Sequence, residues 1–576
     1  MNIKPICLSA VFALSAAFCF AKDDVKIGAD IPWTTYEAEK MKTTGTVLGP
    51  QYGPFLVETE SSGQQCVKLT AKGQYAEFKA TAAANSIVIR FSLPDNEKGE
   101  GTRTSLGIYV NGKQVQVQKI NSYYSWLYGN YPFSNEPKDG KPRNFYDETR
   151  IMNIAIAKGD MIRVKRDDAS GDNAEYCILD FVDLENVAAP IPAPENSVSV
   201  TDKSATGFDA NENFTEALLR CLTIAVEKGK IVYIPAGTYK LTREINVPEK
   251  VTIQGAGMWH TLIVGDEKLY PDNSSNRVRF RGNGSNIHLA DFALLGKLNY
   301  RDDSEPNDGI GGSFGENSTI TRIWIEHTKA GIWVENSKGL VVDGCRLRNT
   351  VADGINFCVG MAESSMKNCT ARGTGDDCFA MWPATWLRQT YKPGKNVITH
   401  CTAQLPFLAN GAAIYGGESN KIEYCSFIDI NPGSAILLSS TFPTAEPALN
   451  INNHFSGTTV VENCSVKTSG GYDHGWQWRA AVQICLDKRA ISGIALNNVT
   501  IDDSFSDGLS IITVEDYGVV VELSNATFTN VKIGKYGIGA KDRHGLWIAE
   551  KSRGSVTLKD CVISETKNDS KNFAIK

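Results

Sequence analysis

The sequence predicts an all-β protein in which an antiparallel β-sandwich of jelly-roll type precedes a right-handed parallel β-helix. Two observations carry this prediction. Residues 22–186 are short runs of alternating apolar and polar residues broken by turn residues, which is typical of an antiparallel sandwich. Residues 199–576 repeat with a period in the low twenties, which is typical of a solenoid with one coil per repeat.

The first 21 residues have the features of a secretory signal peptide. A positive charge at Lys4 precedes an apolar run from Ile6 to Phe20, and Ala21 places a small residue before the expected cleavage point. The run is shorter than the roughly 20 residues of a membrane-spanning helix, and charged residues follow it at once. We therefore predict a secreted mature chain that is not held in a membrane.

The sandwich prediction rests on segments in which every second residue is apolar. Tyr75–Ala80 and Ser86–Phe91 alternate in this way, and Asn111-Gly112 is typical of a hairpin turn. Residues 187–198 are rich in proline and alanine, which predicts a semi-extended linker. The β-helix domain is expected to follow, from residue 199 to residue 576.

One amphipathic helix is expected at the start of the second domain. Phe214, Leu218 and Cys221 follow the helical spacing of apolar residues, Asn213 is in the position of an N-cap, and Gly229 is a natural stop. Such a helix would cover the open N-terminal end of the β-helix, where strand edges are unpaired.

Two columns of equivalent positions define the coils. Near the centre of the domain, both columns have the same spacing between consecutive coils. Cys345 and Cys369 are 24 residues apart, and so are Asp353 and Asp377. No two cysteines have the CxxC spacing of a zinc site, so stacking in the interior as small buried hydrophobes is favoured. The columns consist of Asp308, Ala330, Asp353 and Asp377, and of Cys345, Cys369, Cys401, Cys425 and Cys464.

The aspartate column predicts a catalytic centre. Equivalent positions on successive coils stack about 4.8 Å apart, so Asp353 and Asp377 should face the same space, with Asp376 beside them. Carboxylates this close repel, which raises the pKa of at least one of them. A glycosidase requires one protonated and one ionised carboxyl group. An Asp-rich turn, a calcium site or a solvated ladder remain the alternatives.

Other candidate substrate contacts surround this column. Asp308 lies two coils upstream, roughly 10 Å away on the same spacing, and is expected to bind sugar unless it is only a turn residue. Aromatic rings pack against sugar faces, so aromatic residues after the aspartates are candidate platforms. These are Trp382, which is foremost, and Trp386, Tyr415, Trp476 and Trp478.

Three segments of the repeat resemble glycoside hydrolase family 87, the α-1,3-glucanases and mycodextranases. They are Ile323-Trp-Ile-Glu-His-Thr-Lys-Ala-Gly-Ile-Trp333, Asp353-Gly-Ile-Asn-Phe357 and Arg372-Gly-Thr-Gly-Asp-Asp-Cys-Phe-Ala-Met-Trp382. The resemblance covers most of residues 200–576. It implies an inverting enzyme without a catalytic cofactor, in which Asp376 is the general acid and Asp353 and Asp377 hold and activate the water.

The net charge and the motifs that are missing indicate that the binding partner is a neutral polysaccharide. The formal net charge is −6 with both signs interspersed, whereas a nucleic-acid-binding protein would carry a basic stripe. The three aspartates more distantly resemble those of polygalacturonases, but the Gly-His-Gly and Arg-x-Lys motifs that serve a uronate substrate have no match after Asp377. A monomer that acts on an α-glucan is therefore expected, and α-1,3-glucan and nigeran remain alternative substrates.

The N-terminal domain resembles carbohydrate-binding modules of families 35 and 6. The resemblance rests on Tyr36-Glu-Ala-Glu39 and Leu179-Asp-Phe-Val-Asp-Leu184. It implies a structural Ca²⁺ held by Glu37, Glu39 and Asp180, whose oxygen ligands suit this ion. Solvent-facing acidic residues are the alternative.

Two rival functions share the β-helix and the secretion signal. A pectate lyase would abstract a proton from a uronate with calcium and a basic residue. A glycan-binding solenoid would use the aspartate column only as structure.

Overall fold

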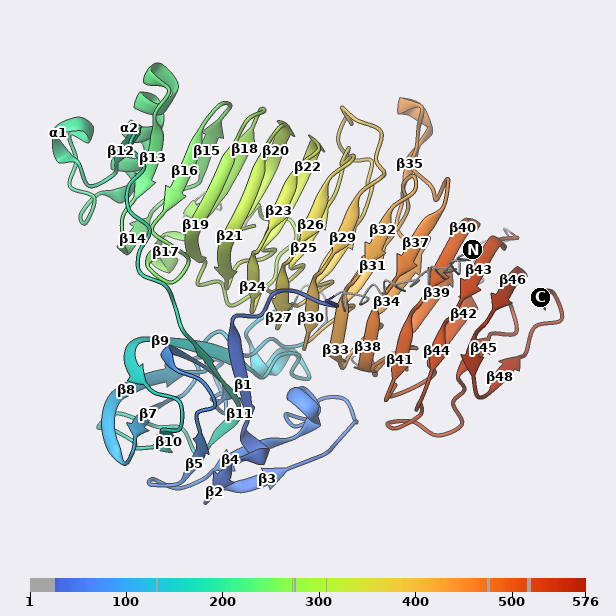
Figure 1. Ribbon diagram of the computed structural model, residues 1–576, viewed down its shortest axis with the longest axis horizontal. Coiled ribbons are helices and arrows are strands. Elements are labelled where there is room, and N and C mark those ends of the chain that lie inside the picture. The colour runs from blue at the N-terminus through green and yellow to red at the C-terminus, as the bar shows by residue number, and fades with distance from the viewer. Residues whose placement is uncertain are drawn as a thin grey trace, which may run out of the picture.

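The computed structural model describes residues 26–130, 133–271, 273, 276–306, 308–473, 477–514 and 520–576. It confirms the predicted all-β fold, in which an antiparallel sandwich precedes a parallel β-helix (Figure 1). The predicted signal peptide and Trp476 lie outside the described residues. Within these ranges, every helix is too short or too polar to cross a membrane.

The N-terminal domain consists of two antiparallel sheets. In β5 and β10 alternate residues, such as Ala76 and Val164, are buried between the sheets, while Glu77 and Arg163 form an ion pair on the outside. This is the alternation that the sequence predicts. One sheet contains β1 (Trp33–Glu37), β3 (Thr46–Leu48), β4 (Cys66–Leu69), β6 (Ala84–Ser92), β9 (Asp147–Ile156) and β11 (Cys177–Glu185). The other contains β2 (Lys42–Thr43), β5 (Tyr75–Lys79), β7 (Arg103–Val110), β8 (Lys113–Asn121) and β10 (Met161–Arg166).

The second domain winds through a 24-stranded and a 12-stranded parallel sheet. A regular coil contributes two strands to the first sheet and one to the second. The 24-stranded sheet runs from β12 (Ser197–Ser199) to β49 (Phe573–Ile575). The 12-stranded sheet consists of β15 (Ile245–Pro248), β18 (Phe280–Asn283), β20 (Ile310–Glu316), β22 (Ile332–Lys338), β25 (Ile355–Phe357), β28 (Phe379–Met381), β31 (Ala412–Ile414), β34 (Ile436–Ser439), β39 (Val482–Leu486), β42 (Leu509–Thr513), β45 (Leu546–Ile548) and β48 (Thr566–Asn568).

The cysteine column stacks inside the β-helix, as predicted. Cys345 precedes β24 (Arg346–Arg348), Cys369 precedes β27 (Thr370–Arg372), and these two strands pair in parallel. Both thiols are buried and unpaired, and each donates to a backbone carbonyl of the preceding coil. These cysteines therefore serve as core residues.

Helix α2 (Phe214–Lys228) covers the N-terminal end of the β-helix. Its apolar face packs against the first strands of the coil. Gly229 ends the helix with a positive φ of 63°, and its amide donates to the carbonyl of Ala225. Asn213 is the N-cap residue, as predicted, but its side chain makes no capping hydrogen bond. Its backbone does not adopt the extended conformation typical of a capping residue.

The segment between the domains lies against the β-helix. Strand β11 ends at Glu185, and the amide of Ile191 donates to the carbonyl of Ala256. Strand β12 begins at Ser197 and pairs with β13 (Ile231–Ile234). The last two residues of the predicted linker therefore belong to the β-helix.

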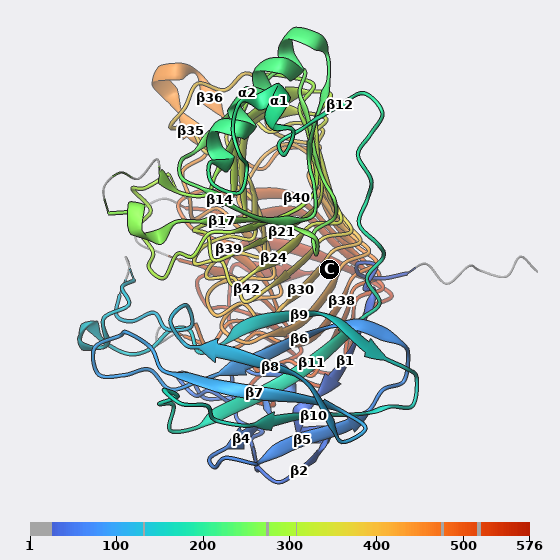
Figure 2. The ribbon, with the colours of Figure 1, turned by 90° about the vertical axis from the view of Figure 1, so that its left-hand side faces the viewer.

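The sandwich docks on the outer surface of the 24-stranded sheet through buried ion pairs (Figure 2). Arg346 binds Glu185 with two hydrogen bonds of 2.7 and 2.8 Å. Arg372, one coil further on, binds Glu148 at 2.6 and 2.9 Å and Asp183 at 3.0 Å. These side chains are buried at the contact, so the two domains form one unit.

Candidate active site

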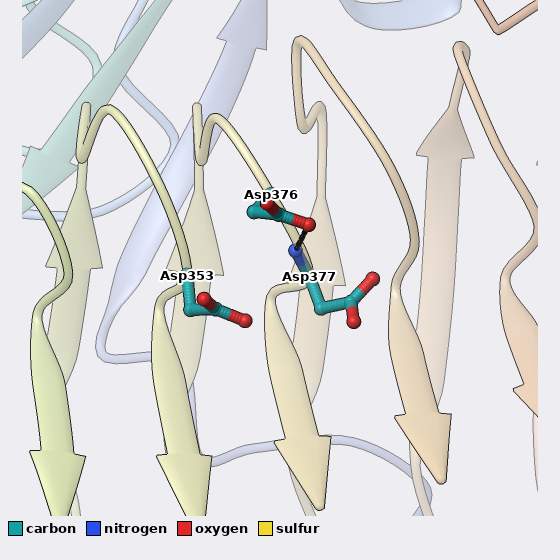
Figure 3. Close-up of side chains that lie close together, drawn as sticks. All are labelled: Asp353, Asp376 and Asp377. Carbon is teal, nitrogen blue, oxygen red and sulfur yellow. Dashed lines mark hydrogen bonds between the residues drawn. The ribbon is translucent and has the colours of Figure 1, made fainter. Parts of the chain in front are cut away.

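Three aspartates from two consecutive coils converge just before strands β25 and β28, near the middle of the 12-stranded sheet (Figure 3). Asp353 lies two residues before β25 and Asp377 two residues before β28, and these strands pair so that Ile355 is opposite Phe379. The amide of Gly354 donates to the carbonyl of Asp377 (2.9 Å), which stacks the two turns directly. Each of Asp353, Asp376 and Asp377 has a carboxylate oxygen within 4.8 Å of the others.

The burial of the three side chains differs. Asp353 and Asp377 are 6% and 2% exposed, whereas the Asp376 side chain is 30% exposed. Figure 3 shows Asp376 above the turn, where the amide of Asp377 donates to its Oδ1 (3.1 Å). Asp376 is therefore the member of the group that a bound substrate reaches most easily.

Burial and mutual repulsion change the acidity of the two buried aspartates. Burial, followed by the charges of Asp376 and Asp377, raises the pKa of Asp353 well above its ordinary value. Burial, followed by the charge of Asp376, raises the pKa of Asp377 to about 7. Asp353 therefore retains a proton at pH values at which an ordinary aspartate is ionised, which agrees with the repulsion that the sequence predicts.

Asp377 is held by donors from the next coil. Asn410 donates its backbone amide (3.2 Å) and its side-chain amide (2.8 Å) to Oδ1, and the hydroxyl of Tyr415 donates to Oδ2 (2.7 Å). Three donors to one carboxylate favour its ionised form and oppose the effect of burial. Tyr415 is only 6% exposed. The ring is therefore largely buried and its hydroxyl orients Asp377, while its contact with substrate stays a prediction.

Arg301 is a residue of the site that the sequence reasoning missed. It lies in the segment before β20, and its guanidinium forms an ion pair with Asp376 (Nη2 to Oδ2, 2.6 Å) and donates to the carbonyl of Gly375 (2.8 Å). The same guanidinium contacts Asp303 (3.1 Å), and the backbone amide of Arg301 donates to the carbonyl of Phe133 in the sandwich (3.1 Å). A loop of the first domain thus supports the arginine that holds Asp376. Neither the coil period nor the resemblance contains a signal for this contact.

Asp308 occupies the predicted column and is as buried as Asp353. It is 6% exposed and pairs with Arg279 (3.5 Å) and Lys329 (4.0 Å). Its sugar-binding role stays a prediction, and these two cations hold the carboxylate in place. Its column position is as predicted, because the amide of Gly309 donates to the carbonyl of Ala330 on the next coil.

Aromatic side chains form a cluster beside the aspartates. The ring of Trp382 lies 4.8 Å from that of Trp386 and 4.9 Å from that of Phe442. Trp386 and Phe442 are exposed (49% and 39%), and Trp333 packs against both tryptophans. These rings provide an apolar surface on which a sugar face can lie.

The predicted calcium ligands do not form a ligand set. Asp180 forms a buried ion pair with Arg90 and accepts from the amide of Ser62 (3.0 Å). Among the residues that the structure describes, only the three active-site aspartates bring three ligand atoms close enough for one ion. Asp180 is therefore wrongly assigned, because Arg90 already neutralises it.

Glu37 and Glu39 retain features of a cation site. Each has a buried carboxylate oxygen without a hydrogen-bond partner. Burial, and then the nearby Asp180, Glu39 and Asp429, raises the pKa of Glu37 to about 8. Asp429 belongs to the β-helix and accepts from Ser62 and Gln64 of the sandwich. These two glutamates fit a cation, which would relieve the repulsion among them.

Comparisons with known proteins agree with this architecture. The family described as alpha-1,3-glucanase catalytic domain D1 matches residues 30–187, and the family described as catalytic domain D2 matches residues 213–564. The crystal structure of the Agl-KA catalytic domain is 27% identical, with a TM-score of 0.84 over 96% of this chain and 98% of that chain. The catalytic unit of a thermostable GH87 α-1,3-glucanase from Streptomyces thermodiastaticus strain HF3-3 is 27% identical, with a TM-score of 0.70 over 95% and 98%.

A further GH87 α-1,3-glucanase has been solved in complex with tetrasaccharides. It is 26% identical, with a TM-score of 0.79 over 96% of this chain and 99% of that chain. Its structures include three variants with a single aspartate changed to alanine, at positions 23 and 1 residues apart. Asp353, Asp376 and Asp377 have the same spacing.

The pre-neck appendage protein of Bacillus phage phi29 is also similar to part of the chain. It is 28% identical over 190 residues, which are 31% of this chain and 21% of the phage protein. The chain thus spans about a fifth of the length of this curated relative.

Proposed function

Because the chain belongs to the family of α-1,3-glucanase catalytic domains, glycoside hydrolase family 87, we propose that it hydrolyses α-1,3-glucosidic bonds of a neutral glucan. The observation that carries the proposal is the convergence of Asp353, Asp376 and Asp377 next to an exposed aromatic cluster. Three carboxyl groups provide acid and base, and the rings provide a surface for the sugar.

The relatives support the choice of substrate. Solved family 87 enzymes carry nigerose and tetrasaccharides. A neutral glucan also agrees with the groups at the site of this chain. The arginine closest to the aspartates, Arg301, is occupied by Asp376 and Asp303, so its charge is already balanced. A uronate substrate would require a free positive charge instead.

We assign the general acid to Asp376. Its carboxyl group is the exposed one and can reach the glycosidic oxygen, whereas Asp353 and Asp377 lie deeper, on adjacent coils. Two stacked carboxyl groups that share a proton suit the binding and activation of one water. Tyr415 and Asn410 hold Asp377 in place for this role.

The ion pair with Arg301 favours a second assignment of the same residues. Arg301 contacts Asp376 at 2.6 Å, so this carboxylate already has a cationic partner, whereas a general acid must donate a proton to the glycosidic oxygen. Under the first assignment, the substrate loosens this pair when it binds. Under the second, Asp353, whose pKa burial raises well above its ordinary value, donates the proton. Substrates with activated leaving groups distinguish the two assignments.

We propose an inverting reaction, which is tested by its first product. The protein should release reducing sugar from α-1,3-glucan, and proton NMR should detect the β-anomer first. The proposal rests on the resemblance to family 87 and not on the carboxylate spacing, since the closest oxygens of the three groups lie within 4.8 Å, whereas acid and base of inverting enzymes are usually roughly 6.5–9.5 Å apart. Initial release of the α-anomer would show retention. Faster cleavage of nigeran than of α-1,3-glucan would identify a mycodextranase.

We propose that Glu37 and Glu39 bind a structural Ca²⁺ near the domain contact. Chelation should therefore lower the melting temperature, because a bound ion stabilises the folded state by mass action. In calcium-free protein, Glu37 binds its proton more tightly when folded than when unfolded, since its pKa rises from 4.5 to about 8. Its contribution to the free energy of unfolding is thus present at low pH and is lost as pH rises from about 4.5 through 8.

Calorimetry of wild type and Glu37→Gln, with calcium and with chelator, measures this effect. The variant should lose both the response to calcium and this part of the pH dependence. The same melting temperature for the wild-type protein with and without calcium would contradict the proposed calcium site.

We also propose that the chain is exported. The signal-like segment of residues 1–21 supports this proposal, and a polymeric glucan is accessible only outside the cell that secretes the enzyme.

A further inference from the structure

A polar cavity, separate from the three aspartates, lies on the 12-stranded sheet several coils beyond them. It has a volume of about 210 Å³, which is far more than a single ordered water occupies. Its walls come from β39, β42 and β45, which Figure 1 shows in the C-terminal part of the β-helix. Strand β45 is five strand spacings from β28, or about 24 Å along the helix axis.

The strand register places this cavity on the same face as the catalytic aspartates. Asp507 lies two residues before Leu509, the first residue of β42, as Asp377 lies two residues before Phe379. Trp547 in β45 belongs to the outward-facing column that contains Trp333 in β22. One continuous face therefore carries a tryptophan upstream of the aspartates and another downstream.

Two tryptophans provide ring surface at the cavity. Trp547 is half-buried, and its indole N–H donates to Asp569 (3.0 Å), which holds the ring in place. Trp478 comes from the segment before β39 and packs edge-on against Tyr472 at 5.4 Å. Both rings line the cavity. Fixed aromatic rings beside polar groups are the usual means of holding a sugar.

Two polar atoms at the cavity have no partner within the protein. Gln483 is 3% exposed, and its side-chain Nε2 is buried without a hydrogen bond, while its Oε1 accepts from Ser510 (3.4 Å). The hydroxyl of Thr513 is also buried without a partner. A buried donor without a partner destabilises the unliganded protein, so a ligand that accepts a hydrogen bond from it is favoured.

Asp507 completes the polar wall but does not form a catalytic pair. Its Oδ1 accepts from the backbone amide of His544 (2.7 Å), and its Oδ2 contacts Arg543 (3.4 Å). The imidazole Nδ1 of His544 also lies 3.3 Å from Asp507 Oδ1, and its Nε2 lies 4.0 Å from the exposed Glu565. Since Asp507 has a balancing cation and no partner carboxyl group among the cavity-lining residues described, the cavity has the groups for binding and not for hydrolysis.

The geometry points to a second carbohydrate-binding site in this cavity, which takes a glucosyl unit of the α-glucan away from the cleaved bond. The inference rests on the proposed function for the identity of the sugar. A long chain that lies along the 12-stranded sheet reaches both the aspartates and the cavity. A disaccharide is too short to do so. The site therefore increases affinity for polymer over short substrates.

Binding of the full-length protein to insoluble α-1,3-glucan tests this site. Asp376→Asn is the parent, so that the glucan is not consumed during the assay. Trp547→Ala and Trp478→Ala should each raise the apparent Kd about tenfold, from the loss of one sugar-ring contact. Trp547→Phe keeps a ring and should bind nearly as the parent does. Lys532→Ala is the control, because Lys532 is an exposed residue of the 24-stranded sheet and does not line the cavity.

Gln483→Met provides a test that does not depend on the tryptophans. It removes the unpartnered amide at similar volume, so affinity for glucan should fall while the melting temperature does not. In otherwise native protein, the ratio of the rate on polymer to the rate on a short oligosaccharide should also fall about tenfold in Trp547→Ala.

The outcomes separate this site from the proposed function. Parent-like binding by both tryptophan-to-alanine variants and by Gln483→Met would overturn the site, even if the wild-type protein hydrolyses glucan. Weaker binding by these variants supports the site, even if the wild-type protein fails to hydrolyse α-1,3-glucan, in which case only the proposed function is lost.

Discussion

Replacement of Asp376 by asparagine is expected to lower kcat on α-1,3-glucan about 10²–10⁴-fold, the usual contribution of a general acid. The loss should be much smaller on an α-glucosyl fluoride or an activated aryl α-glucoside, because these leaving groups need little protonation. Asparagine preserves the shape of the side chain but cannot donate an acidic proton. Steady-state rates on both substrate types measure the difference.

Asp353→Asn and Asp377→Asn should lower kcat by a similar factor on every substrate. These changes impair the activation of water, which an activated leaving group cannot replace. In all three variants the Kd for oligosaccharide should stay close to the wild-type value, because the aromatic cluster of Trp382 and Trp386 is untouched. Asp302→Asn is the control, since Asp302 lies beside Arg301 in sequence but accepts from Ser304 instead of contacting the three aspartates.

Rescue by activated substrates also decides between the two assignments. If Asp353→Asn is rescued and Asp376→Asn is not, the proton donor is Asp353, and Asp376, paired with Arg301, is the base. Near-wild-type activity on glucan in any of the three variants would remove that aspartate from the mechanism.

Replacement of Arg372 by methionine is expected to destabilise the protein by about 3–5 kcal/mol, because it removes the hydrogen-bonded cation from buried Asp183 and leaves buried Glu148 only the more distant Arg348, at 3.7 Å. Both carboxylates belong to the sandwich, so the variant should also weaken the contact between the domains. Denaturant unfolding that is followed by tryptophan fluorescence measures the loss. A two-domain protein can unfold in more than one step. The expected loss of stability can therefore take the form of a separate, early unfolding transition of the sandwich.

The matched control for this prediction is Arg243→Met. Arg243 forms an exposed ion pair with Glu216 on helix α2, and exposed pairs contribute about 0–1 kcal/mol. An unchanged transition in Arg372→Met would show that the buried pairs do not hold the domains together.

The sequence by itself determined the β-helix and the core of its catalytic centre. A coil that repeats in register stacks equivalent residues one strand spacing apart, so spacing alone brings Asp353 next to Asp377. The same rule places Cys345 and Cys369 in the interior. In the sandwich, the alternation in Tyr75–Lys79 similarly predicts which residues face the core.

Only the tertiary structure decided which charged groups surround each position of the aspartate column. Asp308 shares the column with Asp353, but Arg279 and Lys329 engage it, and both come from other turns. The contact of Arg301 with Asp376 joins residues 75 positions apart, and the pairing of Arg372 with Glu148 joins residues 224 positions apart. Such contacts depend on where insertions fold and where the sandwich docks. A repeat relates each residue only to its counterparts on neighbouring coils, so it contains no information about partners outside the column.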